Sequence, residues 1–308
     1  MSESYPMMGL MVVKILNEHI KKYADIFGLS PEVIAGAIAE EWAYNDIIQD
    51  MVASLSIETD KNGRATQSAH DKIKNAYINN EGSVWGRPVG AASIVISTAI
   101  GLLTDYLNSI RVNGVVDLSQ DKLNLAQYEN NYGQLCLDLI DGRGTISIGE
   151  PDQAEYSLPT TVIFTGLMLK QGENFFSNLP VYGTSWKLLT PQLRDGVLIT
   201  YFNIGSHIKV ASPAGPFTKI KGLFADDKNK TYFFPTYFPK PGSGDSGGQV
   251  FIDDQKTLLE YLYPEETASQ IENRLQAIEK ELLDIIAVRL ISNKKVQNLN
   301  ELCYESVA

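Results

Sequence analysis

The chain has 308 residues, of which 44% are apolar and 20% charged, and this balance is typical of a globular protein with one large domain or two smaller ones. Acidic residues outnumber basic ones by 37 to 26, and the basic ones are scattered singly, so the sequence lacks the basic stripe of a nucleic-acid-binding protein. The cysteines Cys136 and Cys303 and the histidines His19, His70 and His207 lie far apart in the sequence, so we expect no metal centre, disulfide framework or cofactor.

The N-terminal segment, 1–6, has neither a basic start nor an apolar stretch, so we expect no secretory signal peptide. The longest nearly uncharged stretch, 88–104, is at the short limit for a bilayer span and opens with Pro-Val-Gly. We interpret it as a buried helix and expect no stable membrane insertion.

Apolar spacing predicts that the first third of the chain is helical. Apolar residues recur at intervals of three and four, and Ser30-Pro31-Glu32 supplies an N-cap, a first-position proline and an early acid. The expected helices are 8–28, 31–52, 67–79 and 92–111.

The region at about 112–157 is irregular in pattern. Asn-Gly at 113–114 and Asp-Gly-Arg-Gly at 141–144 favour turns, and 145–148 is a short β-like run. We therefore predict an insertion between helices.

The remainder of the chain alternates between helical and loop-like patterns. Helices are expected at 158–171 and 188–204, and Pro, Gly and aromatic residues predict loops with short strands at 206–264. At 265–293 the apolar residues form a heptad seam, which packs on the rest of the chain or, alternatively, binds a partner helix.

Two carboxylates follow the apolar face of the helix that begins at Pro31. A glutamate at the rim of a core is partly buried, and burial raises its pKa as a general acid near neutral pH requires. Glu40 and Glu41 point about 100° apart on a helix, so one can face a cleft while the other faces solvent. A solvated acidic pair is the alternative.

Three short runs share their order with the motifs of a known family. The run 38–45, Ile-Ala-Glu-Glu-Trp-Ala-Tyr-Asn, resembles the catalytic-helix motif of goose-type lysozymes and lytic transglycosylases. The run 89–94 is similar to the second motif of that family, 199–205 is similar to its third, Ala-Tyr-Asn-Ala-Gly, and 158–169 matches the helix before it. In this register the resemblance implies that Glu41 is the catalytic acid.

The resemblance implies a mainly α (α+β) fold with a lysozyme-like catalytic domain at 1–206. The segment 207–308 would supply a loop-rich region and a C-terminal amphipathic helix, packed on the same domain. The implied activity is cleavage of the β-1,4 bond between N-acetylmuramic acid and N-acetylglucosamine in peptidoglycan. A non-catalytic lysozyme-like binding or assembly protein is the alternative.

The matching residues also have physical reasons to contact a glycan. Gly90 lets the backbone approach a sugar ring, and Asn203 offers a donor and an acceptor to an acetamido group, although helix packing and C-capping are simpler roles for them. The residues expected to bind substrate, in one groove with Glu41, are Tyr44, Trp85, Gly90, Ser93, Tyr201 and Asn203.

Several positions depart from the transglycosylase pattern. Trp42 replaces a common Ser, Ala92-Ser93 replaces the frequent Met-Gln, and Phe202 replaces a Tyr whose hydroxyl lies in the site. Glycan cleavage is therefore favoured over transglycosylation in particular. Hydrolysis with inversion needs a second carboxylate about 6.5–9.5 Å from the acid. The candidates are Asp46, Glu58, Asp60 and Glu81.

Two other motifs have simpler explanations. The run 244–248, Gly-Asp-Ser-Gly-Gly, matches the nucleophile loop of trypsin-like proteases. Those proteases are built from β-barrels, whereas this chain is helical before and after the run, so we interpret the run as a connecting loop. A serine hydrolase would require His207 or His70 beside Ser246. The run 58–63 imitates half of a calcium loop, yet position twelve is Ala69, so an Asn-Gly turn is favoured.

A peptidoglycan enzyme made in the cytoplasm without a signal peptide needs another route to the wall. A phage lysis enzyme and an effector exported by a specialised secretion system into the periplasm of a target bacterium both meet this need, and the pI near 4.8 favours the effector. Its expected partners are peptidoglycan glycan strands and a neutralising immunity protein.

Overall fold

A computed structural model describes ten segments of the chain. They are residues 4–41, 57–79, 88–89, 92–144, 158–178, 191–204, 217–221, 231–235, 250–251 and 254–278. These residues are mainly helical with little sheet, as predicted. The chain forms two compact units, Pro6–Met168 and Met1–Tyr5 with Leu169–Ala308. The predicted division into 1–206 and 207–308 stays a prediction. No helix in the described segments has the length and apolarity to cross a membrane.

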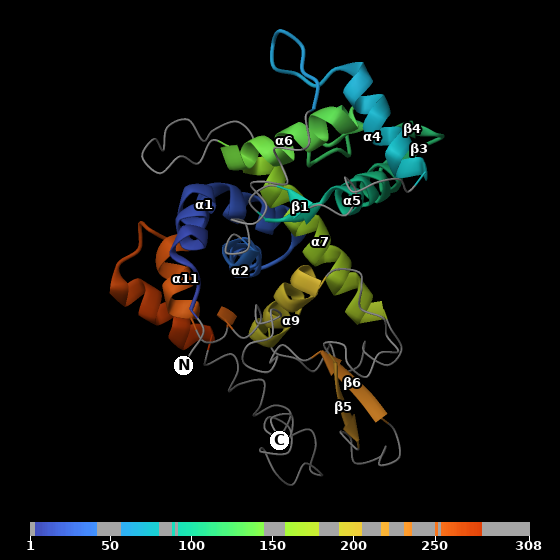
Figure 1. Cartoon of the computed structure of the whole chain (residues 1–308). Helices are drawn as coiled ribbons and strands as arrows, with labels where there is room; N and C mark the ends of the chain where they lie inside the picture. Colours follow the sequence, from blue (N-terminus) through green and yellow to red (C-terminus); the bar gives the residue numbers. More distant parts are fainter. Residues whose placement is uncertain are drawn as a thin grey trace. The chain divides into compact units, whose positions relative to one another are not determined.

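Helices α1 (Met7–Phe27) and α2 (Pro31–Glu41) open the Pro6–Met168 unit and pack against each other (Figure 1). Gly28 ends α1 in the left-handed conformation, at φ 63°, and the Ser30 hydroxyl accepts a 3.1 Å hydrogen bond from the Val33 N–H. The predicted limits of the first helix and the predicted start of the second are therefore confirmed. The predicted continuation of the second helix to residue 52 lies outside the described residues.

The backbones of α1 and α2 touch where Gly9 faces Ala39. A Cβ atom on Gly9 would lie 1.9 Å from the Ala39 carbonyl oxygen, well inside van der Waals contact. Each residue from Val33 through Glu40 is buried, so α2 is surrounded by protein over its length. Few helices have no polar face, and this one forms the interior of its unit.

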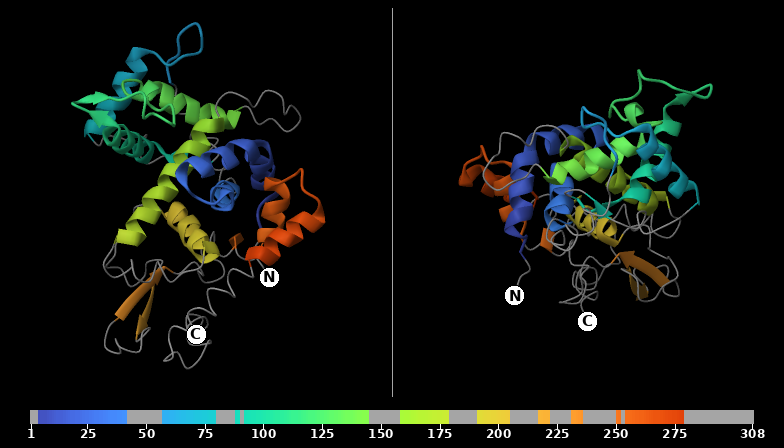
Figure 2. Two further views of the ribbon diagram at one scale, coloured as in Figure 1. Left: turned by 180° about the vertical axis from the view of Figure 1, so that it is seen from behind. Right: turned by 45° about the horizontal axis from the view of Figure 1, so that its top comes forward.

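Helix α4 (Gln67–Asn79) matches its predicted range and lies beside α6 (Tyr132–Gly144) (Figures 1 and 2). The prediction of an irregular insertion was wrong for α6. Asn131 Oδ1 accepts the Gln134 N–H at 3.2 Å as an N-cap, and the buried face of α6 stabilises the helix against its two late glycines. That face consists of Leu135, Cys136 and Leu139.

Two short hairpins flank α5 (Ile96–Ser109). The first pairs β1 (Pro88–Val89) with β2 (Ile94–Val95), so the predicted helix at 92–111 begins four residues late, because β-branched residues favour strand there. The second pairs β3 (Arg111–Val112) with β4 (Val115–Val116). Its turn is the predicted Asn-Gly pair, with φ 51° at Asn113 and 82° at Gly114.

A polar network joins the segment between β4 and α6 to the rest of the Pro6–Met168 unit. It contains the 3₁₀ turn η2 (Ala126–Tyr128), and Asp121 accepts hydrogen bonds from the Tyr106 hydroxyl and from two backbone N–H groups of the following turn. The Tyr128 hydroxyl donates to Asp138 Oδ2 at 2.6 Å. Burial and the neighbouring Asp138 raise the pKa of Tyr128 well above its ordinary value.

Helix α7 (Leu158–Asn178) begins in one unit and ends in the other, and it is longer than the predicted 158–171. The second unit also holds α9 (Pro191–Ile204), within its predicted range, and a hairpin of β5 (Phe217–Lys221) with β6 (Thr231–Pro235). This hairpin confirms the short strands predicted there.

The prediction of loops up to residue 264 was wrong for α11 (Gln255–Leu262). Asp254 joins its start to the N-terminal segment, because one carboxylate oxygen accepts the Thr257 hydroxyl at 2.5 Å and the other accepts the Tyr5 N–H at 3.0 Å. Eight residues with three buried leucines give a signal too short to detect by periodicity.

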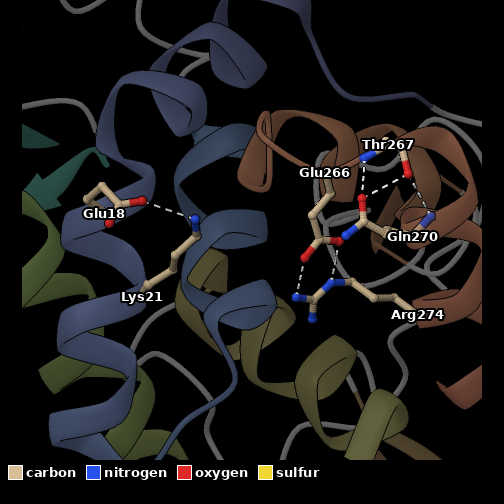
Figure 3. A network of polar contacts seen from close by, with 6 residues as sticks. All are labelled: Glu18, Lys21, Glu266, Thr267, Gln270 and Arg274. Atoms are coloured by element: carbon tan, nitrogen blue, oxygen red, sulfur yellow. Dashed lines mark hydrogen bonds and ion pairs between the residues drawn. The ribbon is translucent and has the colours of Figure 1, made fainter.

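The predicted C-terminal helix is described at residues 268–278. Thr267 and Gln270 form a reciprocal capping box at its start, and Arg274 binds both carboxylate oxygens of Glu266 at 2.6 and 2.7 Å (Figure 3). Of the heptad positions in this segment, Ile271 is buried, which favours packing on the chain at that position. The seam beyond residue 278 lies outside the described residues.

Candidate functional site

Glu41 is the last described residue of α2 and lies where the buried helix reaches the rim of the core. Its neighbour Glu40 is only 5% exposed, whereas Glu41 is partly exposed. The interpretation of a solvated acidic pair is therefore wrong, and of the two carboxylates Glu40 is the more deeply buried. The expectation that the apolar face of α2 leads into a partly buried glutamate is confirmed.

The surroundings of Glu41 favour its neutral form. Burial and, as a smaller effect, the negative charge of Glu40 raise the pKa of the Glu41 carboxyl to about 8. A hydrogen bond from Ser93 acts against both effects, and the value of about 8 includes it. At neutral pH the carboxyl therefore carries a proton that it can donate, as a general acid must.

Ser93 brings the β1–β2 turn to the end of α2. Its hydroxyl donates a 3.4 Å hydrogen bond to the backbone oxygen of Glu41, across 52 residues of sequence. Ser93 has φ 49°, a left-handed conformation that costs a residue other than glycine on the order of 1 kcal/mol. Two of the three motifs are thus adjacent in the fold, through Glu41 and Ser93.

Other predicted site residues in this part of the sequence are not described. Tyr44, Trp85 and Gly90 lie outside the described residues, and so do two of the four candidates for a second carboxylate, Asp46 and Glu81. Their roles stay predictions.

The remaining second-carboxylate candidates, Glu58 and Asp60, are exposed and lie in a turn. Asp60 Oδ1 accepts the N–H groups of Asn62 at 2.8 Å and Arg64 at 2.9 Å, and these bonds lower the pKa of Asp60. Gly63 has φ 73°, which confirms the Asn-Gly turn in place of a calcium loop. Within the described segments no three His, Cys, Asp or Glu side chains are grouped as a metal site requires.

The third motif lies in the other unit, on α9. Tyr201 is 4% exposed and its ring contacts Phe175 and Phe176 at centroid distances of 6.1 and 5.8 Å. Gly172 allows this packing, because a Cβ atom there would lie 2.6 Å from the Tyr201 ring. These contacts account for Tyr201 as a core aromatic of its unit. The side chain of Asn203 lies outside the description, so a common groove with Glu41 stays a prediction.

The residues of the serine-hydrolase alternative are only partly described. Ser246 and His207 lie outside the described residues, whereas His70 is 3% exposed and its Nδ1 accepts the Tyr132 N–H at 2.8 Å. This bond gives His70 a structural role at the start of α6.

The Cys136 thiol is buried, and burial raises its pKa to about 12. The thiol therefore stays protonated at neutral pH and is unreactive in this environment.

Glu40 has no role in the predicted site, and its burial was not predicted. The composition of α2 indicates that Glu40 is buried, because the seven residues before Glu40 are all apolar or glycine. Because α2 is apolar on every face from Val33 to Ala39, the residue that follows it is expected close to the interior.

Comparison of the chain with family models, curated proteins and solved structures finds no match.

Proposed function

We propose that this protein is a peptidoglycan glycosidase with a lysozyme-like fold, in which Glu41 is the proton donor. The observation that supports the proposal is the Glu41 carboxyl, which lies at the rim of a buried helix with its pKa raised to about 8. The adjacency of Ser93 to Glu41 supports it further, because the family's first and second motifs would meet in this way.

In the proposed reaction the Glu41 carboxyl donates its proton to the glycosidic oxygen as the bond from that oxygen to the sugar C1 breaks. The transition state is oxocarbenium-like. When the 6-hydroxyl of the same sugar attacks C1, the Glu41 carboxylate accepts the proton of that hydroxyl. When water attacks with inversion, a second carboxylate accepts the proton of the water. Water as the nucleophile gives a reducing end, and the 6-hydroxyl of the same sugar gives an anhydro product.

The substrate would bind through the predicted contacts at Tyr44, Trp85, Gly90, Ser93 and Asn203. We propose delivery by a specialised secretion system to the periplasm of a target bacterium, with an immunity protein as the neutralising partner. The acidic pI of about 4.8 supports this over lysins that attach to walls through basic surfaces.

The test is digestion of purified sacculi by the wild type and by Glu41→Gln. The amide has nearly the shape of the acid but no proton of suitable pKa, so we expect a rate loss of about 100-fold or more. Glu32→Gln, which makes the same change in the first turn of α2, should retain activity. Mass analysis of the released muropeptides distinguishes anhydro from reducing ends. Wild-type activity in Glu41→Gln, or intact sacculi after treatment with the wild type, would refute the proposal.

A further inference from the structure

Helix α4, at the end of the segment 57–79, is attached to its unit by few buried side chains. The buried residues of α4 are Ala69, His70 and Ile73, and the helix lies beside α6 (Figure 1). An element that buries so little apolar area opens more easily than the core of its unit. Each polar contact between α4 and α6 therefore matters for its attachment.

Two hydrogen bonds cross from the segment 57–79 to the start of α6. His70 Nδ1 accepts the Tyr132 N–H at 2.8 Å, and Gln134 Oε1 accepts the Ala65 N–H at 3.1 Å. The two segments approach closely between these bonds, because a Cβ atom on Gly133 would lie 3.1 Å from both the Ala65 Cβ and the His70 backbone nitrogen. One of the two bonds needs an unprotonated imidazole nitrogen.

The bond at His70 exists only while the imidazole is neutral. Nδ1 accepts an N–H only when it carries no proton, so the proton of the neutral ring is on Nε2. Protonation of Nδ1 would set two N–H groups against each other. It would also place a cation at the N-terminus of α6, which is the positive end of the helix dipole.

The other surroundings of His70 act mainly in the same direction. Its side chain is 3% exposed, and burial opposes the charged form. Among the described residues the side-chain charges that act on it are both on α4, where Asp71 favours protonation and Lys74 opposes it. From α6 the ring of Tyr132 contacts the imidazole at a centroid distance of 5.2 Å. The attached segment therefore holds a neutral histidine.

We propose that the contact between His70 and Tyr132 is a pH-sensitive switch, which holds the segment 57–79 on α6 at neutral pH and releases it locally in mild acid. Release exposes His70 to water, where the imidazole takes up a proton as an ordinary histidine does. Proton uptake therefore drives the opening, while the rest of the unit keeps its fold. The inference is independent of the proposed function.

The experiment measures amide hydrogen exchange by NMR at about pH 7.5 and pH 5.5, as protection factors corrected for the intrinsic pH dependence of exchange. The Ala65 amide is the informative probe, because its bond to Gln134 contains no titrating group. Opening coupled to a histidine that titrates at 6.5 when released should lower the protection factors of Ala65 and Tyr132 by about tenfold between these pH values. The Asp117 amide, which donates to the Ile110 carbonyl oxygen at 2.9 Å, should keep its protection.

His70→Asn separates the hydrogen bond from the titration, because the asparagine Oδ1 can take the place of Nδ1 and accept the same N–H without titrating. In this variant the protection of Ala65 and Tyr132 should not depend on pH. His19→Asn, which changes a histidine of α1, is the matched control and should keep the wild-type pH dependence.

Three results would overturn the inference. They are equal wild-type protection of Ala65 at both pH values, a loss of protection in acid that is as large at Asp117 as at Ala65, and an unaltered pH dependence in His70→Asn. If that variant does not fold, the first two comparisons, made on the wild type, decide.

Discussion

Glu41→Gln should make the folded protein less sensitive to alkaline pH. The pKa of Glu41 is raised from 4.5 to about 8 on folding, so the folded state holds the proton more tightly than the unfolded state does. The contribution of this proton to stability is complete below about pH 4.5 and is lost as the pH rises towards 8. The amide has no proton to lose, so the variant does not incur this cost.

The magnitude follows from the change in pKa. Each pKa unit corresponds to about 1.4 kcal/mol, so between pH 4 and pH 9 the wild type should lose about 4 to 5 kcal/mol more than Glu41→Gln. Urea unfolding of both proteins across this range gives the difference, and titrating groups that do not interact with Glu41 cancel in the comparison. Glu32→Gln should follow the wild type. Parallel curves for wild type and Glu41→Gln would refute the assignment of a raised pKa to Glu41.

Two further predictions concern the scaffold around the site. Gly9→Ala should lower the free energy of unfolding by about 3 kcal/mol, because its Cβ would lie 1.9 Å from the Ala39 carbonyl oxygen. Gly101→Ala, in open space within α5, should raise the free energy of unfolding by up to about 1 kcal/mol. Equal effects of the two substitutions in thermal unfolding would contradict the contact at Gly9. Burial lowers the pKa of His70, and its Nδ1 accepts the Tyr132 N–H. The free energy of unfolding should therefore fall as the pH drops below about 6.5, where His70 becomes protonated in the unfolded state first. Titration of the His70 ring by NMR at the ordinary pKa of 6.5 would contradict this prediction.

Strong local signals made much of the fold predictable from the sequence. Helix α1 has apolar residues at regular helical spacing and a glycine at its end, and both limits were predicted to within one residue. The Asn-Gly turns at 62–63 and 113–114 were predicted because few other residues adopt a left-handed conformation without cost.

The errors occurred where tertiary contacts override local preference. The glycines at the end of α6 suggested a turn, but burial of its apolar face stabilises a helix there. The hairpin before α5 contains an apolar run that suits a helix as well as a strand.

The candidate site was predictable as far as Glu41, because its raised pKa follows from an apolar helix that ends in acids. The contact between Ser93 and Glu41 joins residues 52 positions apart and follows from no local pattern; only the resemblance grouped them.

The backbone contact between α1 and α2 also restricts which sequences can carry this arrangement. Position 9 admits only glycine, since any side chain would meet a carbonyl oxygen that cannot move without shifting the helix that carries Glu40 and Glu41. Distant relatives with unrecognisable overall similarity should therefore retain a glycine in the first helix where it meets the second helix. That glycine is a search criterion derived from steric exclusion, and it does not depend on any of the glycan-binding positions.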